Sequence, residues 1–142
     1  DNAYIKHFDE DIVLTHNRLP MRWKQLKELS QRGHLIGAHT MDHYMINSGS
    51  KETLTYQIVT CKKIIEDEIG QPCDYFAFPY GKLSEANQEA IDIACQTYKY
   101  VFSQSDYKNY FSFDGKVINR RHFEPFWPDR HLNYFLGCNK KY

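Results

Sequence analysis

Apolar positions recur along the chain in alternating helical and strand-like patterns. A first helix is predicted from about Leu19 to Gly33, with a proline in its first turn and an apolar face formed by Trp23, Leu26 and Leu29. The short, mostly apolar segment 34–38 follows it directly and is typical of a buried strand. Ser50 is placed to cap a second, longer helix that ends at Gly70, and its apolar stripe comprises Leu54, Ile58, Cys61 and Ile65.

The same alternation continues through the middle of the chain. A strand is predicted over 74–78, a helix capped by Ser84 comes next, and a further strand covers 99–103. Helices that alternate with short apolar strands favour an α/β fold with parallel strands, in which functional groups collect on the loops after the strands. Beyond Ser105 the pattern weakens to an aromatic loop, a strand over 116–120 and an aromatic tail.

Length and charge narrow the functional classes. The 142 residues fit one domain, and 18 basic residues balance 18 acidic ones, so the electrostatic footprint of a nucleic-acid or anionic-membrane binder is absent from the sequence. No apolar run reaches the length of about 18 residues that a membrane span needs. We therefore expect a neutral substrate, and neither a nucleic-acid partner nor a membrane span.

The cysteines favour no zinc knuckle, because Cys61, Cys73, Cys95 and Cys138 form no Cys-x-x-Cys pair. Cys61 and Cys95 fall on the apolar faces of predicted helices, where buried thiols are expected. Cys73 and Cys138 are either free or paired with each other. The spacing does not decide between these alternatives.

His39 and His43 lie just past the predicted strand 34–38. A turn at this point can bring two imidazoles onto one divalent metal ion, although zinc needs at least a third protein ligand and a catalytic site also keeps a position open for water. The alternative is that both are loop histidines without a ligand. Spacing alone leaves both interpretations open.

Two motifs together resemble a known family. The segment 32–43 includes Gly33-His34, Gly37 and His39-Thr40-x-x-His43, and Phe76-Ala77-Phe78-Pro79-Tyr80-Gly81 follows about 35 residues later. They are similar to the second and third motifs of the polysaccharide deacetylases, the NodB-homology domain of carbohydrate esterases. The resemblance runs from about Leu19 to Ser103. It implies a distorted or incomplete (β/α) barrel in which parallel strands alternate with helices.

The resemblance also implies roles for individual residues. His39 and His43 match the family's metal ligands, so the implied cofactor is a divalent metal ion, with Zn²⁺ expected. Thr40 matches the position whose hydroxyl braces the histidine loop. The backbone N–H of Tyr80 matches a donor to the oxyanion, a role in which a fixed donor contributes strongly to acyl transfer.

The sequence departs from the family pattern at three points. The first motif, Thr-Phe-Asp-Asp, which supplies the base aspartate and a third metal ligand, is absent, and the nearest imitation at 7–11 is interpreted as a solvated loop. Ala77 replaces an arginine that orients this aspartate; Arg120 or Arg121 could supply that guanidinium, or both could be surface residues. The family's last motif, Leu-x-His, is matched poorly by the local sequence. The candidate for its general-acid histidine is His122, with His131 as the second choice, and His122 could equally be structural.

We therefore expect residues 1–142 to form a single, N-terminally incomplete domain of the deacetylase type. The predicted function is metal-dependent hydrolysis of N-acetyl groups on a hexosamine-containing poly- or oligosaccharide. The alternative is a catalytically inactive carbohydrate-binding or structural relative. Another α/β hydrolase is less favoured because the sequence lacks a Gly-x-Ser-x-Gly elbow. By family analogy the location is the periplasm, the cell envelope or the extracellular medium.

Overall fold

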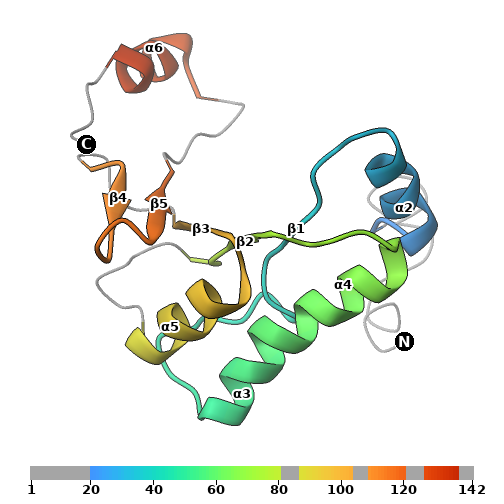
Figure 1. Ribbon diagram of the computed structural model, residues 1–142. Helices are drawn as coiled ribbons and strands as arrows, with labels where there is room; N and C mark the ends of the chain where they lie inside the picture. Colours follow the sequence, from blue (N-terminus) through green and yellow to red (C-terminus); the bar gives the residue numbers. More distant parts are fainter. Residues whose placement is uncertain (1–19, 81–86, 104–108, 121–126, 138–142) are drawn as a thin grey trace, which may run out of the picture.

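The computed structural model describes residues 20–80, 87–103, 109–120 and 127–137, which form a mixed sheet flanked by helices (Figure 1). The elements in chain order are α2 (Trp23–Gln31), β1 (Gly37–Ala38), α3 (Lys51–Thr55), the π-helical turn η2 (Tyr56–Thr60), α4 (Cys61–Ile69), β2 (Tyr75–Ala77), α5 (Gln88–Thr97), β3 (Tyr100–Ser103), β4 (Phe111–Ser112), β5 (Val117–Asn119) and α6 (Asp129–Gly137). This α/β alternation confirms the predicted fold class.

The sheet has the strand order β1-β2-β3-β5-β4. Strands β1, β2, β3 and β5 are parallel, and β4 pairs antiparallel with β5. Because parallel strands end at one edge of a sheet, β1, β2, β3 and β5 all end at the same edge. The antiparallel β4 was not predicted from sequence, which indicated only an aromatic loop there.

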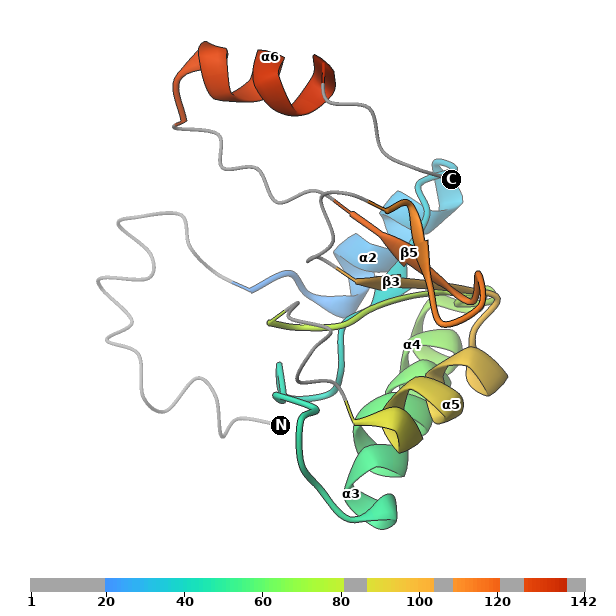
Figure 2. The ribbon, with the colours of Figure 1, turned by 90° about the vertical axis from the view of Figure 1, so that its left-hand side faces the viewer.

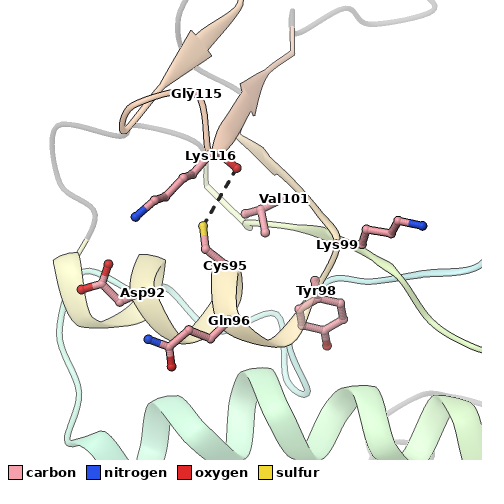
Figure 3. Close-up of a pocket in the computed structure, with 8 residues that line it drawn as sticks. All are labelled: Asp92, Cys95, Gln96, Tyr98, Lys99, Val101, Gly115 and Lys116. Carbon is pink, nitrogen blue, oxygen red and sulfur yellow. Dashed lines mark hydrogen bonds between the residues drawn. The ribbon is translucent and has the colours of Figure 1, made fainter.

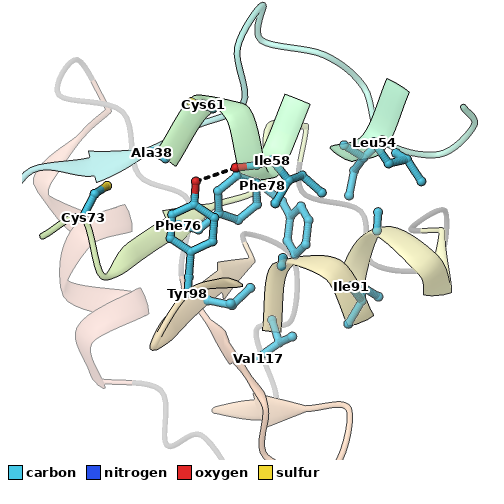
Figure 4. Close-up of a cluster of buried hydrophobic side chains, with 14 residues drawn as sticks. Ala38, Leu54, Ile58, Cys61, Cys73, Phe76, Phe78, Ile91, Tyr98 and Val117 are labelled. Carbon is cyan, nitrogen blue, oxygen red and sulfur yellow. Dashed lines mark hydrogen bonds between the residues drawn. The ribbon is translucent and has the colours of Figure 1, made fainter. Parts of the chain in front are cut away.

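Side chains alternate across the sheet and divide it into two faces. One row consists of the paired residues Ala38, Phe76, Val101 and Val117, all of which are buried against the helices (Figure 4). The next row toward the carboxyl edge contains Ala77, Phe102 and Ile118, which point to the other face and are only half-buried. Residues that continue this second row past the strand ends therefore lie on the face away from the helices.

The long helix predicted to run from Ser50 to Gly70 forms part of the helical layer. Ser50 caps α3 by accepting a hydrogen bond from the Thr53 N–H, and Gly70 ends α4 in a left-handed conformation. The predicted stripe packs into the core, although one turn in the middle, η2, is π-helical. Figure 2 shows α3, α4 and α5 together on one side of the sheet, with α6 on the other.

Three details differ from the sequence prediction. The strand predicted over 34–38 is only Gly37–Ala38, because the His34 N–H donates to the Leu29 carbonyl and so belongs to the end of α2. Leu35 is consequently 74% exposed rather than buried. Helix α5 begins at Asn87, whose side chain accepts from the Glu89 N–H. Ser84, which we predicted as the cap, lies outside the described residues.

The cysteine predictions have mixed outcomes. Cys61 is buried as expected, whereas Cys95 is only half-buried. Cys73 is a buried free thiol, and its suggested partner Cys138 lies outside the described residues. In the part of the chain that the structure describes, no helix is long and apolar enough to cross a membrane.

Candidate active site

The His39 ring is fixed by the strand beside it. Its Nδ1 atom lies 2.7 Å from the carbonyl oxygen of Ala77, at the end of β2. A carbonyl can only accept, so Nδ1 carries the proton and Nε2 keeps a lone pair free. A histidine ligand oriented by a hydrogen bond from its other nitrogen is the usual arrangement at metal sites.

The protonation of His39 also favours a ligand role. Burial lowers the pKa of His39, and the positive charges of His43 and Arg120 act in the same direction. The hydrogen bond to Ala77 opposes this lowering of the pKa only in part. The neutral ring, the form that binds a metal ion, is therefore favoured.

His43 and Tyr80 complete a row of rings at the carboxyl edge. The His39 and His43 ring centroids are 4.9 Å apart in an edge-to-face arrangement, and the His43 and Tyr80 centroids are 4.7 Å apart. The structure thus brings together three of the four predicted site residues. The fourth, His122, lies outside the described residues, as does Arg121, while His131 is exposed on α6 with its ring 6.0 Å from Trp127.

The backbone around these rings adopts unusual conformations. Thr40, His43 and Tyr80 have φ angles of 63°, 53° and 50°, a left-handed region that costs energy for residues with a Cβ. Thr40 is held there because its buried Oγ1 accepts from the Tyr44 N–H at 2.9 Å. This contact is the loop bracing that the resemblance implied for the threonine.

The Tyr80 N–H lies at the end of the β2 segment, beside the histidine pair. The last backbone hydrogen bond between this segment and β3 is donated by the Phe78 N–H to the Phe102 carbonyl at 3.0 Å. Tyr80 follows two residues later, after Pro79. Within the described residues, no backbone carbonyl accepts from Tyr80. A backbone N–H beside the histidine pair is the kind of group that can stabilise an oxyanion.

Arg120 follows β5 and approaches the same edge. Its backbone N–H donates to the Ser103 carbonyl at 2.8 Å, and its charge reaches His39. The Nε and Nη2 atoms are buried without a hydrogen-bond partner among the described residues, and burial lowers the pKa of the guanidinium. Two adjacent guanidinium donors of this kind match the two oxygens of a carboxylate.

Gln57 is a polar contact that sequence reasoning missed. It lies in η2 and hydrogen-bonds the backbone of Met41 and Asp42, inside the histidine loop. The available signal was a glutamine flanked by Leu54, Ile58 and Cys61 on a stripe that is otherwise apolar. A buried polar side chain in such a place requires partners.

The donor set fits a divalent metal ion in part. His39 and His43 supply two nitrogen donors of the type zinc prefers. Among the described residues, no group of three histidine, cysteine, aspartate or glutamate side chains is arranged to hold a metal ion. Cys61 lies behind the His39 backbone, and burial raises the pKa of its thiol to about 11.

The parallel sheet and the histidine pair at its carboxyl edge define an α/β domain with a candidate hydrolytic metal centre. The polysaccharide deacetylase family profile matches residues 7–100, and the chain belongs to this family. The match starts before Leu19 and so includes the segment 7–11, which lies outside the described residues.

Individual relatives agree with this assignment. An inferred polysaccharide deacetylase of Bacillus subtilis, YxkH, is 26% identical over 69 residues, which are 49% of this chain and 25% of that protein. The Streptococcus pyogenes deacetylase PplD, solved in complex with acetate, has a TM-score of 0.68 at 20% identity and covers 89% of this chain and 55% of its own. A de-N-acetylase from Aggregatibacter actinomycetemcomitans has a TM-score of 0.63 at 20% identity, over 81% of this chain and 53% of its own.

The structural matches establish the fold. The chain spans about half the length of the solved relatives and a quarter of the curated one. The fold agrees with the distorted barrel type expected from sequence, and the family is one of carbohydrate esterases.

Proposed function

We propose that this chain contributes the histidine ligands and the oxyanion donor of a metal-dependent hydrolase that removes N-acetyl groups from a hexosamine-containing glycan. The observation that carries the proposal is the hydrogen bond from His39 Nδ1 to Ala77, which leaves Nε2 free beside the His43 ring. The family assignment supports the reaction class. The solved deacetylases of similar fold support the choice of an acetylated substrate.

Each residue has a distinct task in this reaction. His39 and His43 hold the divalent ion, for which we propose Zn²⁺. When bound, such an ion polarises the acetyl carbonyl and lowers the pKa of water. The Tyr80 N–H donates to the oxygen that gains negative charge, and water replaces the amine on the acetyl carbon, so that acetate and a free amine result.

Two further groups are needed for proton transfer. A carboxylate must take the proton from water, and we propose that the buried Nε and Nη2 atoms of Arg120 orient it, in place of the arginine that Ala77 replaces. His122 is our candidate for the acid that protonates the leaving amine. The carboxylate itself is assigned to no residue of this chain.

Metal binding and acetate release test the proposal. We expect Zn²⁺ to bind the wild-type chain, and His39→Ala to weaken binding by more than about 100-fold in calorimetric titration, since it removes a ligand outright. His34→Ala is the matched control, because His34 is exposed and belongs to α2's end. The protein at its full length should release acetate from an N-acetylated chitooligosaccharide.

The competing function is glycan binding without hydrolysis. It would be supported if the full-length protein bound the oligosaccharide, retained no metal ion and released no acetate. Equal Zn²⁺ affinity of the wild type and His39→Ala would contradict the metal site itself.

A further inference from the structure

Gln57 makes three hydrogen bonds to the two residues in the middle of the histidine loop. Its Oε1 accepts from the Met41 N–H at 3.0 Å and from the Asp42 N–H at 3.1 Å, while its Nε2 donates to Asp42 Oδ2 at 2.7 Å. The side chain is only 4% exposed. One buried amide therefore satisfies two backbone donors and one carboxylate oxygen.

These bonds fall between the two strained positions of the loop. Thr40 precedes Met41 and His43 follows Asp42, and both have left-handed φ angles. Such conformations persist only where surrounding contacts over-determine them. Without Gln57, the amides of Met41 and Asp42 would lose these partners, and the turn that brings His43 back to His39 would lose three hydrogen bonds to the helical layer.

Gln57 is itself rigidly placed. It lies in the π-helical turn η2, and both Leu54 of α3 and Ile58 of η2 are fully buried. The Tyr98 hydroxyl donates to the Ile58 carbonyl at 2.7 Å, so a second element of the core holds this turn (Figure 4). Single π turns inside α-helices are frequent at functional sites.

We propose that Gln57 is a positioning residue of the metal centre, which fixes the Met41–Asp42 segment so that His43 remains beside His39. This inference rests on the proposed function, since it concerns the same pair of ligands. Gln57 does not touch the metal ion or the substrate. It acts on the geometry of His43 through the backbone of the loop.

Three variants separate this role from simple packing. Gln57→Leu removes all three hydrogen bonds, whereas Gln57→Glu keeps both acceptor bonds but turns the third contact into a repulsion with Asp42. The double variant Gln57→Glu with Asp42→Asn restores the third bond with its direction reversed, because the new amide donates to the new carboxylate. Gln88→Leu is the matched control: Gln88 also donates to an aspartate, Asp92, at 3.0 Å, but on the exposed face of α5.

Co²⁺ titration followed by visible absorption measures both affinity and ligand geometry. We expect Gln57→Leu to lower Co²⁺ affinity by about 10–100-fold and to change the spectrum, as loss of an orienting contact around a ligand does. Gln57→Glu should weaken binding less, and the double variant should regain affinity to within about threefold of the wild type. Gln88→Leu should leave both readouts unchanged.

Amide hydrogen exchange of the metal-free proteins provides a readout independent of the metal. Met41 and Asp42 should exchange faster in Gln57→Leu, with protection regained in the double variant. Unchanged Co²⁺ affinity in a folded Gln57→Leu, or no recovery in the double variant, would overturn the inference. Failure of the wild type to bind Co²⁺ would instead reject the proposed metal function, and the exchange data would then decide the loop-fixing role by themselves.

Discussion

The two ends of the parallel sheet are built in opposite ways. At the carboxyl end, Thr40, Tyr80 and one of the two histidines, His43, have left-handed backbone, and the buried donors of Arg120 lack partners among the described residues. At the amino end, a recess of about 330 Å³ lies between α5 and the starts of β3 and β5 (Figure 3). Its lining includes Asp92, Cys95, Lys99 and Lys116, and the Cys95 thiol donates to the Lys116 carbonyl.

This contrast shows that a surface recess need not be a reactive site. The recess is open, and the turn beside it also has left-handed φ angles, at Phe113, Asp114 and Gly115. The carboxyl end differs because its left-handed residues lie beside a histidine of lowered pKa and beside buried guanidinium donors that have no partner among the described residues. Strained backbone and perturbed groups cluster at functional sites, so chemistry is expected at the carboxyl end.

Arg120→Met should produce the largest change at the carboxyl end. Removing the guanidinium leaves the proposed base without its orienting partner, and kcat of the full-length enzyme should fall by about 100-fold. The 142-residue chain should meanwhile become more stable by about 1–3 kcal/mol, because two buried donors that have no partner among the described residues are removed. Acetate release and urea unfolding measure the two effects. A loss of both activity and stability would indicate a structural role only.

Thr40→Ala should lower stability without removing a ligand. The buried Oγ1 that accepts from the Tyr44 N–H is lost, which costs about 1–3 kcal/mol in the free energy of unfolding. Thr40→Ser keeps this acceptor and should unfold at nearly the same urea concentration as the wild type. If the serine variant were as unstable as the alanine variant, the hydroxyl would not be the brace.

Alkaline pH should destabilise the fold through Cys61. Burial raises the pKa of this thiol from 9.0 to about 11, so the unfolded chain ionises first and stability falls as the pH rises from about 9 to 11. Cys61→Ala should make the pH dependence of the unfolding free energy shallower in this window. Cys95→Ala, in the recess at the other end, is the comparison and should alter it less, since Cys95 is only half-buried.

The amino-end recess should show the smallest effect. Asp92→Asn and Lys116→Gln change its charges without touching the histidine loop, so metal affinity and kcat should remain within about threefold of the wild type. Calorimetry and acetate release provide the measurement. A larger change would mean that the two ends of the sheet are coupled and that the contrast between them is wrong.

Local signals in the sequence were sufficient for much of this architecture. The Ser50 cap, the Gly70 stop and the apolar stripe between them predicted the long helix, because each acts within a few residues of its own position. The short strand β1 was overestimated since the left-handed Gly33 extends the hydrogen bonding of α2's end to His34. Local patterns do not show how many residues a neighbouring strand will pair.

Site residues that belong to a sequence motif could be predicted, whereas residues that only tertiary packing brings to the site could not. His39, His43 and Tyr80 came from two motifs, and their convergence follows from the adjacency of β1 and β2. The burial of Arg120 depends on the pairing of β3 with β5, a contact between distant segments. The three bonds of Gln57 likewise require the helix to pack against a loop 15 to 16 residues away in sequence, and no sequence pattern encodes that contact.

The two-residue length of β1 has a consequence for assembly. In the described part of the chain, β1 pairs with β2 and ends the order of strands on that side. So short an edge is a poor template for aggregation. A strand that did pair there in parallel, from this polypeptide or another, would end beside His39. The residues that follow such a strand would then lie close to the histidine pair, on the side away from Ala77.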